Sequence, residues 1–253
     1  MQAITFNQPG EWQQNLHLTR QEIKEPQPSE VQIKVMARPI NPADQMFING
    51  SYRIKPALPQ IAGLEGAGII QKVGANISKS LLGLHVSFLS AGTWAESINL
   101  QEGGYRVVPE EIPFETACQL SLNTLTAYGL LEGCGLLPGQ WLILTAANSS
   151  ICRLIIQMAK SRQINILALV RGPQYTSELL ELGATACLNI EDEGLEGQVM
   201  EITQGGANAV LDAVGGELGA KLINITAPFA KIIIVFFLGL KPPPFRRRLK
   251  LKN

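Results

Sequence analysis

The chain has 253 residues, of which 46% are hydrophobic and 17% charged, and its 21 basic residues balance its 21 acidic residues. A chain of this size can bury one large core or two moderate ones, and its balanced charge argues against recruitment of nucleic acid or an anionic membrane. The four cysteines, at 118, 134, 152 and 187, lack the short paired spacing of a disulfide framework or a thiolate zinc site. The longest apolar run, at 232–240, is too short to span a bilayer. We therefore expect a cytoplasmic protein of one or two domains.

The first hundred residues contain short β-type runs separated by proline, glycine and asparagine. These runs lie at 31–40, 66–74, 85–90 and 94–100. Runs of this length without long helical periodicity predict an antiparallel barrel or sandwich. Between the first two of them, the stretch INPADQMFINGSY (40–52) reads as a polar turn followed by a short mixed segment.

From about residue 114 the pattern changes to helical spacing, which continues to the glycines near 135. Beyond it, strands and helices alternate. We predict strands at 141–146, 164–170, 186–190, 209–212 and 232–237, and helices at about 150–161, 175–182, 194–203 and 216–226. Alternation in units of about 30 residues predicts crossover connections and a doubly wound parallel sheet. The final segment, 241–253, is rich in proline and basic residues, and we expect it to be a disordered tail.

The turn after the first predicted parallel strand is the place where a dinucleotide-binding domain holds the pyrophosphate. Here it reads TAANSSICRL (145–154) and contains no glycine, so it lacks the usual fingerprint. Its small side chains still permit close approach, and Asn148 and Ser149 can cap the following helix. We expect the pyrophosphate to lie against Asn148, Ser149, Ser150 and Ile151. A plain turn that binds nothing stays open.

Arg171 follows the second predicted parallel strand. A carboxylate at this place usually selects NAD through the ribose hydroxyl, whereas a cation suits the 2′-phosphate of NADP. A guanidinium can hold a phosphate through two hydrogen bonds, and no carboxylate lies between Arg171 and Glu178. If a dinucleotide binds, we expect NADPH, although Arg171 could also be an exposed arginine in a turn.

Together with GLEGAG (63–68), NTLTAYGLL (123–131) and LDAVGG (211–216), these features resemble the medium-chain dehydrogenase/reductase superfamily over about 1–240. The resemblance implies an α/β protein with a GroES-like β-barrel domain at 1–120 and a doubly wound Rossmann NADP-binding domain at 121–240. Within the superfamily, the motifs INPADQMFINGSY, LPQIAGLEGAG, GTWAESINL and AANSSICRLIIQMAK are similar to those of the 2-enoyl thioester reductases. The zinc-free quinone oxidoreductases share much of the same scaffold.

No metal is expected. Zinc-dependent members carry a histidine before the glutamate of the segment that matches GLEGAG, but Leu64 stands there. Leucine cannot ligate a metal, and His17 and His85 are the chain's two histidines. The resemblance is therefore to the zinc-free members.

The resemblance also assigns roles to five residues. Tyr52 matches the tyrosine that follows the N-P-[SA]-D stretch and donates the proton in enoyl reductases. Asn123 and Thr126 match the segment near the nicotinamide, and we assign Asn41 and Trp94 to the substrate pocket. The plainer alternatives are a loop tyrosine packed under the β domain, a helix-capping asparagine and a core tryptophan.

The implied reaction is NADPH-dependent reduction of an activated carbon–carbon double bond, in a trans-2-enoyl thioester of CoA or acyl carrier protein. Hydride adds to the β-carbon and Tyr52 supplies the proton. A quinone or enone oxidoreductase, and a non-catalytic nucleotide-binding or dimerisation module, are the alternatives. A homodimer is compatible with the resemblance.

Three departures from the family pattern bear on activity. Ser150 and Cys152 replace glycines of the phosphate turn, so we expect weaker cofactor affinity. Phe236, Phe237 and Leu238 replace small residues beside the nicotinamide. The sixth Rossmann strand is replaced after residue 240, so we expect a C-terminally incomplete fold with impaired turnover.

Overall fold

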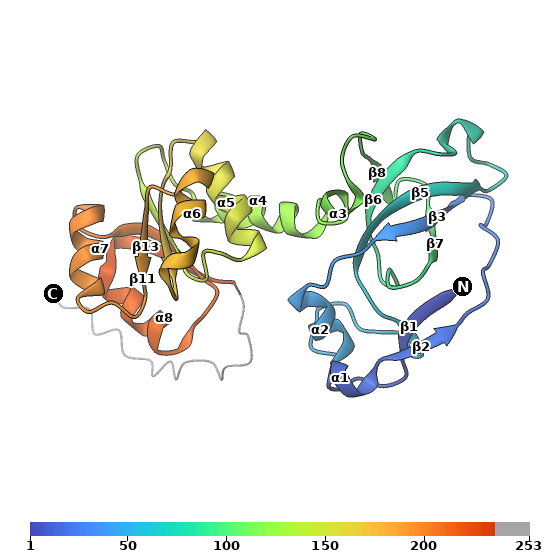
Figure 1. Ribbon diagram of the computed structural model, residues 1–253, viewed down its shortest axis with the longest axis horizontal. Helices are drawn as coiled ribbons and strands as arrows, with labels where there is room; N and C mark the ends of the chain where they lie inside the picture. The colour runs from blue at the N-terminus through green and yellow to red at the C-terminus, as the bar shows by residue number, and fades with distance from the viewer. Residues whose placement is uncertain (236–253) are drawn as a thin grey trace. The chain divides into compact units, whose positions relative to one another are not determined.

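The computed structural model describes residues 1–235 and divides the chain into two compact units, Met1–Thr124 and Leu125–Asn253. Figure 1 colours the chain from blue to red along its length. The expected bulky residues Phe236, Phe237 and Leu238, the expected tail and the expected incomplete end all lie outside the described residues. The two units are described one at a time.

The first unit is rich in β structure. One antiparallel sheet has five strands in the order β7-β3-β5-β6-β8, and a second sheet has three in the order β2-β1-β4. The strands are β1 (Gln2–Phe6), β2 (His17–Arg20), β3 (Glu30–Ala37), β4 (Gln60–Ile61), β5 (Glu65–Val73), β6 (His85–Leu89), β7 (Ser97–Gln101) and β8 (Tyr105–Val107). The helices are α1 (Trp12–Asn15), α2 (Pro42–Ile48), η1 (Lys79–Leu81), α3 (Phe114–Ala117) and the start of α4 (Leu122–Cys134). The four predicted runs correspond to β3, β5, β6 and β7.

Alternation along β3 explains the core of the larger sheet. Val31, Ile33 and Val35 are buried while Lys34 and Met36 are exposed, which is the period-two pattern of a strand; Gln32 on the other face is buried as well. These side chains pack with a cluster that includes Phe88. The first unit therefore has its own apolar core.

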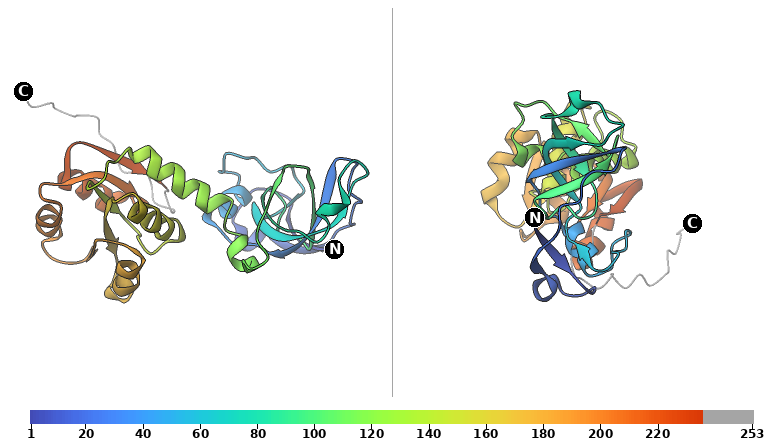
Figure 2. Two further views of the ribbon diagram at one scale, coloured as in Figure 1. Left: turned by 90° about the horizontal axis from the view of Figure 1, so that it is seen from above. Right: turned by 90° about the vertical axis from the view of Figure 1, so that its right-hand side faces the viewer.

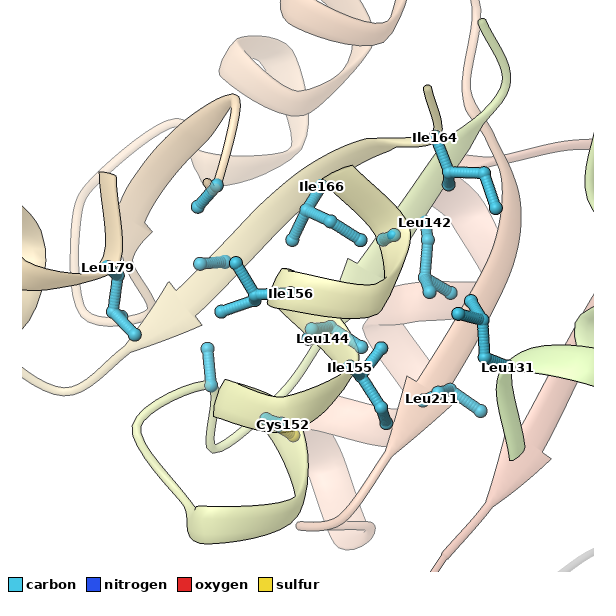
Figure 3. Packing of buried hydrophobic residues seen from close by; sticks show 14 of the residues in the cluster. Leu131, Leu142, Leu144, Cys152, Ile155, Ile156, Ile164, Ile166, Leu179 and Leu211 are labelled. Carbon is cyan, nitrogen blue, oxygen red and sulfur yellow. The ribbon is translucent and has the colours of Figure 1, made fainter. Parts of the chain in front are cut away.

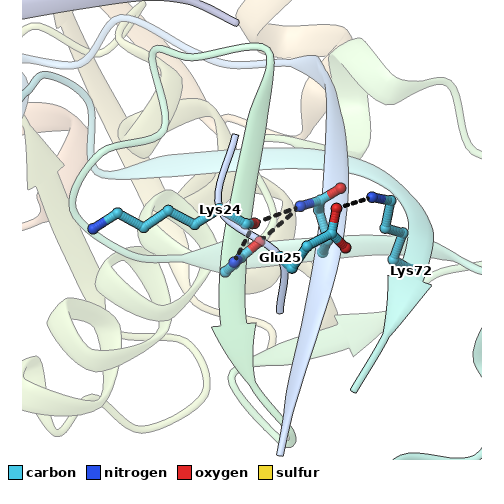
Figure 4. A network of polar contacts seen from close by, with 5 residues as sticks. Lys24, Glu25 and Lys72 are labelled. Carbon is cyan, nitrogen blue, oxygen red and sulfur yellow. Dashed lines mark hydrogen bonds and ion pairs between the residues drawn. The ribbon is translucent and has the colours of Figure 1, made fainter. Parts of the chain in front are cut away.

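A segment without regular structure, 21–29, is held on this sheet by side-chain hydrogen bonds (Figure 4). The Lys24 carbonyl oxygen accepts from Gln32 Nε2 at 2.9 Å and from Asn99 Nδ2 at 3.0 Å. Glu25 forms an ion pair with Lys72 on β5. Backbone groups outside regular structure need other hydrogen-bond partners. Here the side-chain amides of Gln32 on β3 and Asn99 on β7 are the partners of the Lys24 carbonyl oxygen.

The interpretation of 40–52 as a turn and a mixed segment is wrong, because the stretch contains helix α2. Asn41 has an extended conformation at the N-cap, Pro42 is the first helical residue, and the Asp44 carboxylate accepts from Asn41 N at 2.6 Å. Asparagine at the N-cap, proline at N1 and an acidic residue at N3 are recognised start signals. All three signals are present in the sequence.

The second unit has a five-stranded parallel sheet in the order β11-β10-β9-β12-β13. The strand order reverses beside β9, which is the arrangement of a doubly wound fold. The strands are β9 (Trp141–Leu144), β10 (Asn165–Val170), β11 (Ala186–Asn189), β12 (Ala207–Asp212) and β13 (Thr226–Ile234). The helices after α4 are α5 (Ser150–Ser161), η2 (Pro173–Tyr175), α6 (Thr176–Leu182), α7 (Leu195–Thr203), α8 (Gly216–Leu222) and η3 (Ile223–Ile225). The predicted GroES-like plus Rossmann fold class is confirmed.

Both faces of the parallel sheet are covered (Figure 2). On β9, Leu142 and Leu144 belong to one apolar cluster while Ile143 belongs to another. The first cluster includes Ile155 and Ile156 of α5, whose side chains lie against the sheet in Figure 3. Strands buried on both faces read as continuous hydrophobic runs, as WLIL and NILALV do.

Two predicted boundaries are wrong. The last predicted helix ends at Leu222 and passes into η3, and β13 begins at Thr226 instead of 232. The pairing of β12 with β13 shifts register between Ala207 and Ala209, and Phe229 in the extra segment has a φ of +64° and is fully exposed. A bulge of this kind breaks the apolar pattern by which a strand is recognised. The sequence pattern therefore predicted only the second half of β13, which is regular.

Candidate active site

The turn between β9 and α5 is short and tightly held. Ala147 is fully buried, and its N–H donates to the Leu169 carbonyl oxygen at 3.2 Å. Ser149 Oγ accepts from Cys152 N at 3.4 Å, so Ser149 is the N-cap of α5 as expected. Asn148 does not cap the helix, because its Oδ1 accepts from Arg153 Nη1 at 2.9 Å. The turn therefore presents a capped helix N-terminus.

The two residues that replace family glycines behave differently. The Cys152 side chain is 4% exposed and belongs to the core cluster, with Sγ 3.6 Å from the Thr145 carbonyl oxygen. Ser150 is exposed. The expectation that a pyrophosphate must tolerate two added side chains at the turn is therefore wrong for Cys152, and Ser150 is the added group on the surface. Burial raises the pKa of the Cys152 thiol to about 11.

A cavity of about 440 Å³ opens at the carboxyl ends of β9, β10 and β12. In doubly wound sheets, ligands bind at this edge where the strand order reverses. Three predicted cofactor residues come together in its lining: Asn148, Ser149 and Arg171. Two others, Ser150 and Ile151, stand in the first turn of α5 outside the lining. Further lining residues are Ala146, Ala147, Leu169, Val170, Tyr175, Ile190, Ala213, Val214 and Leu218.

Arg171 lies exposed at the end of β10. Within residues 1–235 its guanidinium makes no hydrogen bond or ion pair, whereas Arg153 is paired with Glu178. That pairing lowers the pKa of Glu178, mainly through the hydrogen bond from Arg153. The nearest carboxylate along the chain is thus already occupied, and Arg171 is a cation at the rim of the cavity with its donors available to an anion.

Asp212 at the end of β12 is a buried carboxylate that the sequence reasoning missed. Its Oδ1 accepts from Thr145 Oγ1 at 2.8 Å, from Val214 N at 2.9 Å and from Gly215 N at 3.0 Å. Thr145 Oγ1 in turn accepts from Ala213 N at 2.7 Å. The network joins the ends of β9 and β12 below the cavity. The available signal was an acidic residue that ends an apolar strand directly before a glycine-containing loop.

In the first unit, Tyr52 follows α2. Its N–H donates to the Met46 carbonyl oxygen at 2.9 Å, and its half-buried side chain packs against a cluster that includes Phe47 and Trp94. No described residue forms a hydrogen bond with its hydroxyl group. Trp94 is 7% exposed, and its Nε1 donates to the Pro39 carbonyl oxygen at 3.3 Å. Trp94 is thus a core residue of this unit with one edge hydrogen-bonded.

Two predicted site residues, Asn41 and Asn123, belong to one buried polar network. Glu65 Oε1 accepts from Ser121 N at 2.9 Å and from Leu122 N at 2.6 Å, and its Oε2 accepts from Asn41 Nδ2 at 3.1 Å. Asn123 Nδ2 donates to Asn41 Oδ1 at 3.3 Å. Glu65 therefore accepts hydrogen bonds from N–H groups at the start of α4 that have no partner within the helix. Its negative charge is also favourable at a helix N-terminus. Thr126 lies one turn further along the same helix.

Asp44 and Glu65 are two buried carboxylates of this unit that the sequence analysis did not identify as site residues. Both are 1% exposed, and burial raises the pKa of Asp44 to about 6, against the opposing hydrogen bond from Asn41 N. Burial likewise raises the pKa of Glu65, which also lies near Asp44. A capping-box pattern could have located Asp44. For Glu65 the available signal is the glutamate of the GLEGAG motif itself.

Residues 1–235 contain no group of three or more histidine, cysteine, aspartate or glutamate side chains that could hold a metal ion. Among the same residues, no helix is both long enough and apolar enough to cross a membrane.

A β-rich unit followed by a doubly wound unit with a cavity at its strand-order reversal is a domain arrangement typical of dehydrogenases. Family comparisons agree. The family described as "Alcohol dehydrogenase GroES-like domain" matches residues 27–135, and the one described as "Zinc-binding dehydrogenase" matches residues 150–250. The chain belongs to the medium-chain dehydrogenase/reductase superfamily.

Enoyl reductases and quinone reductases are among the individual relatives. The mitochondrial enoyl-[acyl-carrier-protein] reductase of Xenopus tropicalis is 34% identical over 182 residues, which are 71% of this chain and 52% of that protein. A Bacillus thuringiensis structure named as an NADPH:quinone reductase is 33% identical with a TM-score of 0.84, covering 91% of this chain and 71% of the other. The Escherichia coli quinone oxidoreductase, solved with NADPH, is 26% identical with a TM-score of 0.81, covering 92% and 72%. The chain spans 52% to 63% of the length of its first three curated relatives.

Proposed function

We propose that this chain is an NADPH-dependent reductase of an activated carbon–carbon double bond, with a trans-2-enoyl thioester as substrate. The observation that carries the proposal is the cavity at the strand-order reversal, whose lining includes both the turn after β9 and Arg171, which has no ion pair within residues 1–235. The enoyl reductase names among the relatives and the match of 40–52 to the enoyl reductase motif support the substrate class.

The chain's own residues fit a dinucleotide. Ser149 and the N-terminus of the twelve-residue helix α5 would receive the pyrophosphate, because free N–H groups and the helix dipole favour an anion there. Arg171 would hold the 2′-phosphate through charged hydrogen bonds. Asn123 and Thr126 would orient the nicotinamide. When bound, the reduced cofactor supplies the hydride.

Tyr52 would supply the proton. Hydride addition at the β-carbon of an enoyl thioester leaves negative charge on the carbonyl oxygen and the α-carbon of the substrate. A phenol can donate a hydrogen bond to that charge and then transfer its proton to the α-carbon, without a metal. The Tyr52 hydroxyl has no hydrogen bond to a described residue, so it is available for this role.

The test compares crotonyl-CoA with a naphthoquinone while NADPH oxidation is followed by absorbance. We expect turnover of crotonyl-CoA, and we expect Tyr52→Phe to lose it while binding NADPH normally. Tyr105→Phe is the matched control, because Tyr105 is a partly buried tyrosine packed on the larger sheet of the same unit. Crotonyl-CoA turnover that is unchanged in Tyr52→Phe would refute the assignment of the proton donor.

The second candidate is a quinone or enone oxidoreductase, which is favoured by the names of the structural neighbours. In that case the naphthoquinone is reduced and Tyr52→Phe has little effect. A chain that oxidises NADPH with neither acceptor would indicate the third alternative, a non-catalytic nucleotide-binding module. The expected homodimer can be checked by light scattering. The expected cytoplasmic location stays a prediction, since several relatives are named mitochondrial.

A further inference from the structure

The buried network around Glu65 fixes which end of each neighbouring amide is the donor. An ionised carboxylate has acceptors and no donor. Glu65 already accepts from two backbone N–H groups, and the third group that faces it is Asn41 Nδ2 at 3.1 Å. Asn41 must therefore turn its NH₂ group toward Glu65. The alternative would place two acceptor oxygens against each other in a buried site, which is costly.

The orientation of Asn41 sets that of Asn123 in the same way. With its NH₂ on Glu65, Asn41 presents Oδ1 to Asn123, which donates from Nδ2 at 3.3 Å. Asn123 Oδ1 then accepts no hydrogen bond from any residue in 1–235, although the side chain is only 5% exposed. Asn123 Oδ1 is not among the buried polar atoms without a partner in residues 1–235, so this acceptor reaches the surface and is open to a donor from a ligand.

We propose that Glu65 and Asn41 are positioning residues that fix Asn123 as a hydrogen-bond acceptor for the N–H of a carboxamide. The inference rests on the proposed function, because the nicotinamide carboxamide is the ligand group that would supply this N–H. It goes beyond that function by assigning a role to Glu65, and by specifying the direction of the hydrogen bond at Asn123.

The proposal makes an unusual prediction for Glu65→Gln. The glutamine keeps its carbonyl oxygen on the N–H groups of Ser121 and Leu122, so its NH₂ group must face Asn41. Asn41 then turns its oxygen to residue 65 and its NH₂ group to Asn123. Asn123 reverses in turn and presents NH₂ where it had presented oxygen. A substitution two residues away along the network thus converts an acceptor into a donor.

Asn41→Asp in the Glu65→Gln background should restore the original direction. An aspartate at residue 41 accepts from the glutamine and from Asn123 Nδ2, so Asn123 Oδ1 is again vacant. Aspartate is also a good N-cap, so α2 keeps its start. Glu102→Gln, which neutralises an exposed glutamate of the same unit, is the control for loss of one negative charge.

The first measurement is a neutron crystal structure of the unliganded wild-type chain, which distinguishes nitrogen from oxygen in both amides. We expect Nδ2 of Asn41 on Glu65 and Nδ2 of Asn123 on Asn41. The opposite orientation of either amide overturns the inference, whatever the catalytic activity. This measurement does not depend on whether any variant folds.

The second measurement is the ratio of affinities for NADPH and its reduced 3-acetylpyridine analogue, whose methyl ketone has no N–H. We expect the wild type and Glu102→Gln to prefer the carboxamide by about three- to tenfold, the effect of one hydrogen bond. Glu65→Gln should lose this preference and the double variant should regain it. An unchanged ratio in folded Glu65→Gln overturns the positioning role. A wild type that binds neither nucleotide overturns the proposed function and the ligand, and the neutron structure then decides the amide orientation separately.

Discussion

Asp44 gives the most quantitative prediction about this chain. Its carboxylate is 1% exposed and accepts from Asn41 N at 2.6 Å, yet burial raises the pKa from 3.8 to about 6. Desolvation therefore outweighs the hydrogen bond, since burial disfavours the charged form. The folded chain binds this proton more tightly than the unfolded chain does.

The sign of the pH dependence follows from that comparison. Between about pH 4 and pH 6 the folded state holds the Asp44 proton while the unfolded state has lost it, so this contribution to stability falls as pH rises. A difference of about two between the pKa values corresponds to about 3 kcal/mol. The stabilisation is complete below the unfolded pKa and is lost above the folded one. Asp44→Asn, which cannot titrate, lacks this term.

The assay is urea unfolding at several pH values from about 4 to about 7, for the wild type and Asp44→Asn. Trp12 and Trp94 report on the first unit, so a Trp141→Phe background removes the signal of the second. We expect the variant to gain about 2 kcal/mol relative to the wild type between the two ends of the pH range, because pH 4 already lies slightly above the unfolded pKa. Asp192→Asn, in an exposed loop, controls for a simple change of charge. A stability difference that does not vary with pH would refute the reasoning.

Three further changes have defined outcomes. Arg171→Ala should weaken NADPH by about 1–3 kcal/mol in calorimetry and leave NADH unchanged, since the charged hydrogen bonds to the 2′-phosphate are lost; equal losses would mean that Arg171 does not contact that phosphate. Gly63→Ala should destabilise the first unit by about 1–3 kcal/mol in thermal unfolding, because φ is +89° and the new Cβ would lie 2.2 Å from Trp94 Cδ1; an unchanged melting temperature would contradict this. Ile156→Ala, at a fully buried position on α5, should cost about 2–5 kcal/mol in urea unfolding of the second unit; a loss below 1 kcal/mol would show that the site collapses around the change.

The second unit was readable from the sequence because its pattern is long and repeated. Runs such as WLIL and NILALV, each followed by a helix-forming segment, fix the order of strands and helices without tertiary information. The prediction failed at β13, where Pro228 and Lys231 interrupt the apolar run and only the pairing with β12 shows the strand. Local pattern cannot anticipate a bulge that long-range pairing maintains.

The candidate site was predicted in part. Asn148, Ser149 and Arg171 were found because their positions relative to strand ends follow from chain order, and the strand ends meet at one edge. Glu65 and Asp212 were missed because their importance depends on burial and on partners far away in the sequence. Cys152 was judged by its place in the turn, whereas the direction of its side chain, into the core, is set by the helix that follows.

The hydrogen bond between Thr145 and Asp212 has a consequence for folding during synthesis. Segments from 146 to 218 form the cavity wall, and the hydrogen bonds below it join strands whose ends are far apart in the chain. A ribosome delivers β9 long before β12, so a growing polypeptide carries the phosphate turn for some time with no opposite wall. On the proposed function, nucleotide affinity would therefore be acquired only after β12 is made, and a fragment that stops before β12 should not bind a dinucleotide.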